Sequence, residues 1–463
     1  MSTDTANTAL RLPRSTWFIV STEACERFSF YGMTSILTLY LQHQLAMGDS
    51  VAKERVHLFN AGVYYLPLLG GFLADKYLGR YRTILGLSLF YCLGHGSLAL
   101  FEGKEWGVYL GLGLIALGAG GIKPCVSAFV ADQFTTLDER GLSKLYGIWY
   151  WAVNLGAALG FAVIPAIAGT WDQDGRFHAH WGYSWAFGIP GIFMAIAAFV
   201  FWLGTPRYIK KPPQVEADVA IDPQERAEDR KTFLKIVLVL APILIFWALY
   251  YQMNTSWVQQ GEKMQPFYLY GGPDDESNYA IDAQTIQSAS AILVLILIPV
   301  MGVWGYPLMA RIGLPTTMIA KMAMGCLAIA VSFVMVGMYQ NYLDRGGTLS
   351  ILWQLVAYLP LEVGEVMLSV TGLEFAYANA PARMKSVVMG IWFCVTASGN
   401  VLVAMITWLN DRLWNMNAAQ QFYFYAILMV GGAGVFVLIA KLLMRDMPAM
   451  GSYTTPILQP EAD

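Results

Sequence analysis

The sequence predicts an all-α polytopic membrane protein in which twelve transmembrane helices form two six-helix bundles. Three observations lead to this fold class. Only 13% of the 463 residues are charged and 56% are hydrophobic, whereas soluble domains carry about 25% charged residues. Apolar stretches long enough to cross a bilayer, about 20 residues each, occur twelve times. One long polar connector separates the first six from the last six.

Each apolar stretch is expected to form a helix, because a single segment in lipid must satisfy its own backbone hydrogen bonds. Several stretches are longer than the minimum, which predicts tilt or extension beyond the membrane. In chain order the expected spans are 16–45, 54–77, 82–102, 106–133, 142–168, 181–204, 232–259, 282–306, 315–340, 348–379, 384–410 and 418–445.

The basic residues predict the orientation. With the N-terminus in the cytosol, 20 of the 29 Lys and Arg residues fall on the inner side, as the positive-inside rule requires. Both termini are therefore expected in the cytosol, with the protein multi-pass in the cell (inner) membrane. The expected parts are a cytosolic tail 1–15, a bundle 16–205, a cytosolic connector 206–231, which reads as flexible, a bundle 232–446 and a cytosolic tail 447–463. The outer segment before the eighth span reads as an ordinary loop.

Composition also excludes several classes of protein. A formal charge of −3 gives no indication of nucleic acid binding. The five cysteines lie in apolar stretches without a CxxC pair, so neither a disulfide nor a metal site is expected. No nucleophile triad or phosphate-binding loop is recognisable. We expect a protein that is not an enzyme, uses no cofactor or metal, and works in the lipid bilayer as a monomer.

Charged residues inside the spans are candidates for function, because each costs about 2.5–3.5 kcal/mol at the bilayer centre. They are Glu23, Glu26, Arg27, Lys123, Glu362, Glu365 and Glu374. The first three stand at i, i+3 and i+4 on one helix face, and Glu23 precedes Arg27 in the order that favours an ion pair. One carboxylate is left in surplus, and apolar surroundings favour its binding a proton. The alternative is an ion network that only holds the first span against its neighbours.

Lys123 in the fourth span and Glu365 in the tenth occupy equivalent helices of the two bundles at similar depth. Transporters built from such repeats place substrate near the midplane between the repeats. Opposite charges at these positions are expected to meet across a central cavity, forming a link that substrate or a proton can break.

The stretch "GGFLADKYLGRYRT" between the second and third spans resembles the G-x-x-x-D-x-x-G-R-x-R/K loop of the major facilitator superfamily. Its glycines allow close helix approach, and Asp75, Arg80 and Arg82 are expected to form a cytosolic charge cluster. The resemblance implies a major facilitator fold, and we interpret this loop as part of conformational gating.

Four ordered motifs together resemble the proton-coupled oligopeptide transporter family: "ExxERF", "GAGGIKPCVSAFVADQF", "WYWAVNLGAALG" and "GEVMLSVTGLEFAYANAPARMKS". The resemblance implies proton-driven symport of di- and tripeptides into the cell by alternating access. It implies proton coupling by Glu23, Glu26, Arg27 and Glu365, and gating by Lys123 and Glu365. The implied peptide-binding residues are Arg27, Tyr31, Tyr64, Lys123, Asn154, Trp247, Ser290, Glu365, Ser369 and Trp392.

The chain departs from the family pattern at several positions. Thr34 stands where the family usually has an arginine, and Tyr251 where the seventh span usually has an acid. Because both partners of that ion pair are absent, no unpaired charge is left buried. We expect the outer gate to close by packing and hydrogen bonds, with Thr34 near Tyr251. Phe30 replaces a tyrosine, and Ser290 an asparagine.

His57 falls where animal members of the family carry a histidine important for proton coupling. Histidine titrates near neutral pH, so the resemblance adds His57 to the proton-coupling residues. The alternative is a histidine at the water boundary. For the whole chain the alternatives are the same fold carrying nitrate, a drug or another small organic solute, and a membrane-embedded enzyme or peptide-sensing receptor. Glu365 argues against an anion carrier, which gains nothing from an acid opposite Lys123.

Overall fold

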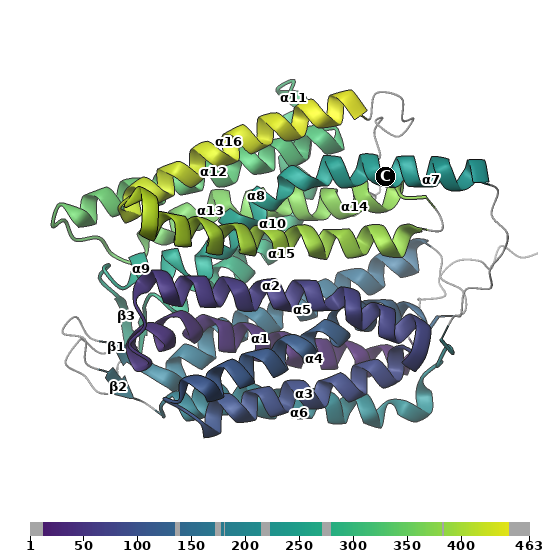
Figure 1. Cartoon of the computed structure of the whole chain (residues 1–463), viewed down its shortest axis with the longest axis horizontal. Coiled ribbons are helices and arrows are strands. Elements are labelled where there is room, and N and C mark those ends of the chain that lie inside the picture. The colour runs from purple at the N-terminus through teal and green to yellow at the C-terminus, as the bar shows by residue number, and fades with distance from the viewer. Residues whose placement is uncertain are drawn as a thin grey trace, which may run out of the picture.

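The computed structural model describes residues 13–134, 139–171, 177–179, 181–213, 223–270, 279–381 and 384–443. Most of the expected tail 1–15, the whole tail 447–463 and residues 214–222 of the connector lie outside these residues. Within them the protein is almost entirely helical (Figure 1).

The first six long helices form the amino-terminal group. They are α1 (Arg14–Leu39), α2 (Asp49–Leu73), α3 (Arg80–Leu100), α4 (Glu105–Ala131), α5 (Glu139–Ala168) and α6 (Tyr183–Leu203). The π-helical turns η1 (Tyr40–Gln44) and η2 (Ala74–Leu78) extend α1 and α2, and the short 3₁₀ turn η3 (Thr205–Arg207) follows α6.

The remaining helices form the carboxy-terminal group, in which three spans are broken into shorter pieces. The seventh span runs through α7 (Pro223–Leu240), η4 (Ala241–Ile243), α8 (Leu244–Tyr250) and η5 (Tyr251–Asn254), and α9 (Ser256–Gly261) follows it. The eighth comprises η6 (Thr285–Gln287), α10 (Ser288–Val300), η7 (Met301–Gly305) and α11 (Tyr306–Arg311). The others are α12 (Met318–Asp344), α13 (Trp353–Glu365) with η8 (Val366–Val370) and α14 (Thr371–Asn379), α15 (Lys385–Leu409) with η10 (Asn410–Trp414), and α16 (Ala418–Leu443).

The helices confirm the predicted class of membrane protein. Among the described residues, 11 helical segments are long and apolar enough to cross a membrane. The twelfth expected span is α1. It has 26 residues, but it is not among these 11 segments, and it contains the charged residues Glu23, Glu26 and Arg27. These charges lie among apolar residues on both sides, so α1 belongs with the other spans.

Two features differ from the sequence-based expectation. The connector was expected to be flexible up to residue 231, but α7 already begins at Pro223. The residues "PQERAEDRK" place proline in the first turn and strong helix formers after it. Two antiparallel β-hairpins also occur in segments expected to be loops: β1 (Gly169–Trp171) with β2 (Phe177–Ala179), and β3 (Phe267–Tyr270) with β4 (Tyr279–Ile281).

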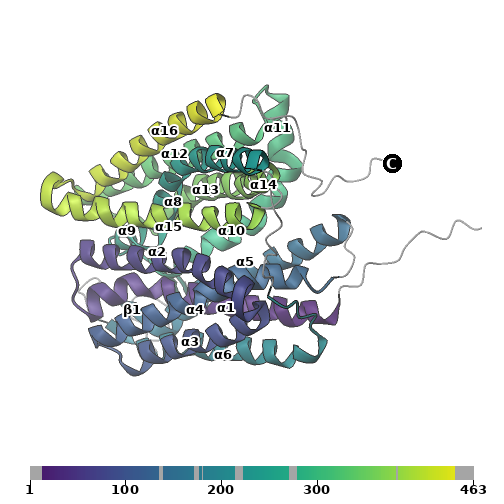
Figure 2. The same ribbon diagram turned by 45° about the vertical axis from the view of Figure 1, so that its right-hand side comes forward.

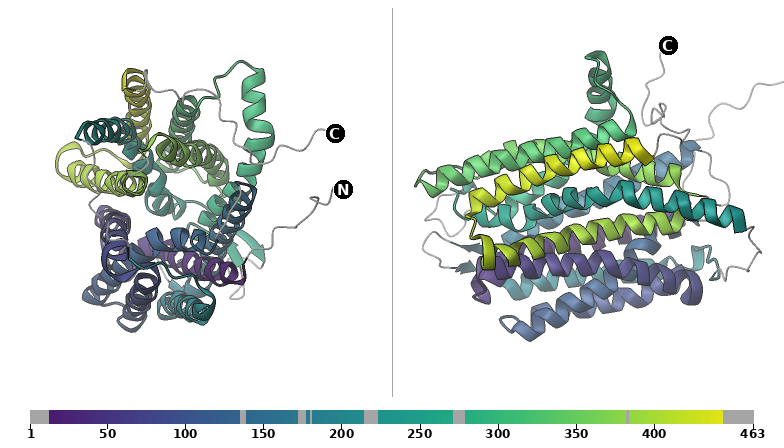
Figure 3. Two further views of the ribbon diagram at one scale, coloured as in Figure 1. Left: turned by 90° about the vertical axis from the view of Figure 1, so that its right-hand side faces the viewer. Right: turned by 45° about the horizontal axis from the view of Figure 1, so that its top comes forward.

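Both hairpins lie at one end of the molecule, on the left of Figure 1, which we call the hairpin end. The opposite end, where α7 begins and α16 finishes, is called the connector end. Figure 2 and the left panel of Figure 3 show the amino-terminal group, purple to blue, gathered below the teal-to-yellow carboxy-terminal group. Helix α2 packs along α15, and α5 packs along α10, so two helix pairs join the groups.

Candidate functional site

The charges of α1 form a compact buried cluster. Arg27 places its Nε 2.8 Å from Glu23 Oε1 and 3.0 Å from Glu26 Oε2. Tyr91 of α3 donates a hydrogen bond of 3.2 Å to Glu26 Oε1. The ion pair expected from the spacing of Glu23 and Arg27 is therefore present, and one guanidinium serves two carboxylates.

Close packing of α1 against α5 fixes this cluster in place. A Cβ atom built on Gly156 would lie 2.4 Å from the carbonyl oxygen of Ala24 and 3.1 Å from Arg27 Cβ. One turn later, a Cβ on Gly160 would lie 2.7 Å from the Phe28 carbonyl oxygen. Both glycines allow a backbone approach that no side chain would permit, and Arg27 lies directly against α5 as a result.

Lys123 of α4 is buried against aromatic rings, with Glu23 and Glu26 as electrostatic neighbours beyond ion-pair distance. Its Nζ lies 4.4 Å from the centre of the Phe30 ring and 4.9 Å from that of Tyr64. A desolvated ammonium over ring faces is attracted by about 2 kcal/mol. None of the ion pairs in the described part of the chain includes Lys123. The expected link between Lys123 and Glu365 is thus not formed in this conformation, and Phe30, a departure from the family pattern, helps to hold the lysine.

Glu365 and Ser369 lie on the same face of the tenth span, as their spacing predicts. Both are half-buried, and neither Glu365 Oε2 nor Ser369 Oγ has a hydrogen-bond partner among the described residues. Arg27 of the amino-terminal group and Glu365 of the carboxy-terminal group are both electrostatic neighbours of Tyr31 of α1. Tyr31 therefore lies near charged residues of both groups.

The other predicted polar contacts are placed less distinctively. Asn154 of α5 is buried, and its amide donates to the Tyr150 carbonyl one turn earlier at 3.0 Å. Ser290 of α10 is also buried and has Tyr250 and Glu362 as polar neighbours.

Three of the predicted aromatic residues form one wall. Trp247 packs edge-on against Trp392 with ring centres 5.9 Å apart. Tyr251 links this pair to Tyr64, with ring centres 5.9 Å from Trp247 and 5.5 Å from Tyr64. The ring of Tyr31 packs against Phe30 and Phe161.

Hydrogen bonds join the two groups toward the hairpin end. Tyr251 donates to the Tyr64 hydroxyl at 2.5 Å, Thr38 donates to the Asn254 carbonyl at 2.5 Å, and Gln287 donates to the Ser35 carbonyl at 3.1 Å. Hydrogen bonds between uncharged residues are present here, as expected, but Tyr251 bonds to Tyr64 and not to Thr34. The hydroxyl of Thr34 donates to the Tyr31 carbonyl of its own helix at 3.1 Å, because a threonine in a helix reaches its own preceding turn.

His57 is part of the same closure. It is completely buried, not at a water boundary, and its Nδ1 and Nε2 lie 2.8 Å from Asn400 Oδ1 and 3.0 Å from Thr255 Oγ1. The Asn400 amide nitrogen donates to the Thr396 carbonyl, which leaves its oxygen to accept from Nδ1. His57 of α2 thus links α15 and the start of α9 through two neutral partners.

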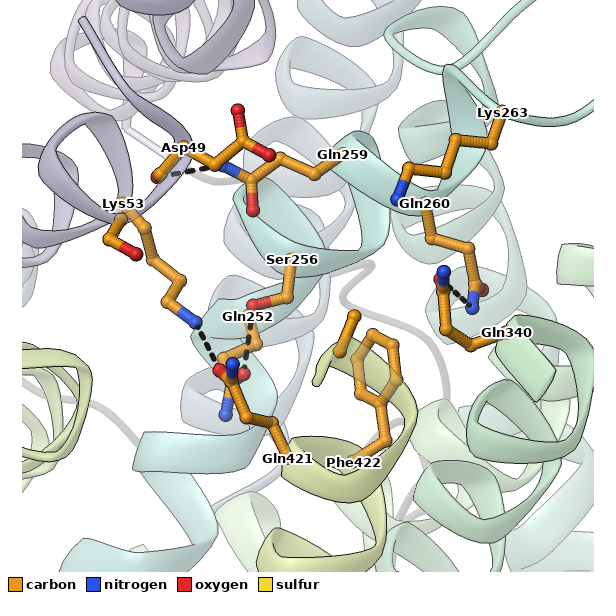
Figure 4. A pocket seen from close by; sticks show the side chains of 12 residues that line it. Asp49, Lys53, Gln252, Ser256, Gln259, Gln260, Lys263, Gln340, Gln421 and Phe422 are labelled. Atoms are coloured by element: carbon orange, nitrogen blue, oxygen red, sulfur yellow. Dashed lines mark hydrogen bonds between the residues drawn. The ribbon is translucent and has the colours of Figure 1, made fainter. Parts of the chain in front are cut away.

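A polar pocket lies between the groups at the hairpin end (Figure 4). Lys53 of α2 is buried there, with Nζ donating to Gln421 of α16 at 3.0 Å. Gln259 donates to the Asp49 carbonyl at 2.9 Å across the same space. Near its rim, His43 Nε2 lies 2.5 Å from Glu262 Oε1. Sequence reasoning missed this set, since charges next to a loop give no sign that two groups will close over them.

The predicted charge cluster at the connector end is built around a different acid. Arg80 pairs with Asp132 Oδ2 at 2.5 Å, whereas its distance to Asp75 is 3.7 Å. Lys211 completes the cluster at 2.7 Å from Asp132 Oδ1. Arg82 is exposed, and none of the ion pairs found in the described residues includes it. The motif correctly indicates Arg80, but Asp132 comes from the far end of α4, which only folding brings near.

No group of three or more His, Cys, Asp or Glu side chains that could hold a metal ion occurs among the described residues. The site consists of charged side chains inside the protein, from Arg27 and Lys123 in the amino-terminal group and Glu365 in the carboxy-terminal group. The profile of the POT family matches residues 81–221 and 215–422. The chain belongs to the POT family.

Solved structures of POT family members have the same fold. One, described as an auto-inhibited POT family peptide transporter, is 32% identical, with a TM-score of 0.83 over 93% of this chain and 97% of its own. The POT family transporter PepTSo is 31% identical, with a TM-score of 0.80 over 94% of this chain and 99% of its own.

Curated relatives agree with the family but are longer. Solute carrier family 15 member 2 of Mus musculus is 33% identical over 364 residues, which cover 69% of this chain and 48% of the relative. Solute carrier family 15 member 1 of Homo sapiens is 31% identical over 382 residues, or 72% of this chain and 52% of the relative. The chain spans about half the length of the curated relatives it matches.

Proposed function

We propose that this POT family chain is a symporter that uses the proton gradient to carry di- and tripeptides into the cell. The observation that carries the proposal is the division of buried charge, with Arg27 and Lys123 in one helix group and Glu365 in the other. A short peptide of any sequence has one carboxylate and one ammonium group. Two fixed partners of opposite sign therefore bind its ends without reading its side chains.

In this proposal the peptide carboxylate binds near Arg27 and Lys123, and the amino group binds near Glu365 and Asn154. The unpartnered oxygen of Glu365 supports its assignment, because a buried acceptor without a donor is stabilised when an ammonium group reaches it. The aromatic wall of Tyr64, Trp247 and Trp392, together with Tyr31, Ser290 and Ser369, lines the space for the side chains.

The arrangement of Arg27 suggests how a proton couples to peptide binding. Glu23 and Glu26 both hold the guanidinium. A proton on either carboxylate weakens that hold, and the guanidinium then has capacity for the peptide carboxylate. One proton crossing about 100 mV supplies about 2.3 kcal/mol, which supports about a fortyfold gradient of neutral peptide.

We propose that the hairpin end faces outward and that both termini and the connector 206–231 are cytosolic, in the inner membrane. The bundles 16–205 and 232–446 then move against each other as a monomer. The hydrogen bonds of His57 and Tyr251 near the hairpin end support a state closed to the outside. The separation of Lys123 from Glu365 fits the same state, because the link is expected to break as the inner side opens.

Uptake by the purified full-length protein in liposomes tests the proposal. With an inside-negative potential and an acidic exterior, labelled dialanine is expected to accumulate, and a protonophore is expected to abolish the accumulation. Unlabelled tripeptide should compete, whereas nitrate should not. Accumulation that the protonophore leaves unchanged, or competition by nitrate but not by peptide, would refute the assignment.

A further inference from the structure

Glu362 is a buried acid for which the peptide site has no use. It lies on α13 one turn before Glu365, and its exposed fraction is 0%. Its polar neighbours are Ser290 and Tyr250, but no hydrogen bond of regular geometry reaches either carboxylate oxygen within the described residues. Two hydroxyl groups therefore lie near the carboxylate, but neither forms a hydrogen bond of regular geometry with it.

No cation faces Glu362 from the elements packed around it, as far as the structure describes them. Its titratable neighbours are three tyrosines and one acid: Tyr150 of α5, Tyr250 of α8, and Tyr358 and Glu365 of α13 itself. Helix α10 contributes Ser290, and the α12 residues packed on this turn, around Gly364, are Gly325, Ala328 and Ile329. Lys123 is held on the other side of the interface by Phe30 and Tyr64.

These surroundings favour the neutral acid. An ionised carboxylate without a counter-ion carries a penalty of several kcal/mol in a protein interior, and Glu365 at i+3 adds like-charge repulsion. The carboxylic acid also supplies one O–H donor, which Ser290 or Tyr250 can accept after a small rotation.

The position of Glu362 relates it to a residue that this chain has lost. The family pattern has an acid in the seventh span where this chain has Tyr251, and Tyr250, the preceding residue and the last of α8, is a neighbour of Glu362. We propose that Glu362 is a proton-binding site of the carboxy-terminal group, taking the place of the missing acid of the seventh span. This proposal rests on the proposed symport function.

The proton would bind one carboxylate oxygen of Glu362 while the cavity is open to the outside, and it would stay bound while Lys123 is held away from α13. As the return step brings Lys123 back toward α13, its positive charge favours the ionised acid, and the proton leaves to water on the inner side. Glu362 would therefore carry a second proton in each transport cycle, in addition to the proton on Glu23 or Glu26.

Measurement of the proton-to-peptide ratio tests this assignment. Full-length wild type, Glu362→Gln and Glu362→Asp are reconstituted, and dialanine accumulation at steady state is measured at an imposed potential of about 100 mV. Glu374→Gln is the matched control, since Glu374 is a half-buried acid of the same span with Lys321 as its neighbour. Glu362→Gln is expected to accumulate about fortyfold less peptide than wild type, because it loses the driving free energy of one proton per cycle. Glu362→Asp and Glu374→Gln are expected to match wild type.

A second readout covers the case in which Glu362→Gln does not transport. Infrared difference spectra of the purified proteins, recorded as pH is lowered without peptide, should contain a protonated-carboxyl band that is absent from Glu362→Gln and kept in Glu374→Gln. An unchanged band, or unchanged accumulation by Glu362→Gln, would overturn the proposal. If wild type itself does not accumulate dialanine, the symport function fails instead, and the infrared band still decides whether Glu362 binds a proton.

Discussion

The hydrogen bond between Tyr251 and Tyr64 allows a quantitative test of how the hairpin end closes. Tyr251 donates to Tyr64 at 2.5 Å, the two residues belong to different helix groups, and both are buried. The bond exists only while the groups are together. Tyr251→Phe removes it and keeps the ring that packs against Trp247, so the closed state should lose free energy and the open state should not.

Hydrogen bonds between helices in membrane proteins contribute about 0.6 kcal/mol on average and up to about 1.7 kcal/mol. The ratio of closed to open molecules should therefore fall by about three- to eighteenfold. Single-molecule energy transfer between dyes at the hairpin ends of the two groups measures that ratio directly.

Tyr40→Phe is the matched control. The Tyr40 hydroxyl accepts from the Gly103 amide within the amino-terminal group, so its loss removes a hydrogen bond without touching the interface. The double variant Tyr64→Phe/Tyr251→Phe should shift the equilibrium no further than the larger single effect, because both changes remove one bond. An unchanged ratio in Tyr251→Phe, or an equal shift in Tyr40→Phe, would refute the reasoning.

Three further predictions concern packing, pH and the connector end. Gly156→Ala should lower the free energy of unfolding by about 1–3 kcal/mol, which a lower melting temperature would show. Gly147→Ala in the same helix should not, because nothing lies within 4 Å of the added Cβ. Equal effects of the two substitutions would contradict the packing argument. His43 lies in η1, past the end of α1, and Glu262 directly follows α9, and the hydrogen bond to Glu262 raises the pKa of His43. The stabilisation by this ion pair is below about 1 kcal/mol. It should be complete below the ordinary histidine pKa of about 6.5 and should vanish as pH rises through the raised pKa of His43. The melting temperatures of wild type and His43→Gln should therefore converge in alkali, and a difference that stays constant with pH would contradict this prediction. Asp132→Asn should lower the melting temperature far more than Asp75→Asn, because Asp132 holds both Arg80 and Lys211; the reverse order would show that the loop acid is the anchor.

The sequence by itself determined the features that depend on local pattern. Span length, charge asymmetry and helical spacing predicted the membrane fold and the pair of Glu23 and Arg27, because these follow from the hydrocarbon thickness and from the period of the helix. The absence of charge at Thr34 and Tyr251 likewise led us to expect contacts by packing and hydrogen bonds between the groups.

Tertiary structure decided the choice of partners. Tyr251 bonds to Tyr64 and not to Thr34, Arg80 bonds to Asp132, and His57 is buried between Asn400 and Thr255. Each of these contacts joins residues far apart in the chain, where the rotation and depth of two packed helices, and not their spacing in sequence, fix which side chains meet. The burial of Glu362 without a counter-ion among the described residues has the same origin, since it is a property of the whole surrounding set of helices.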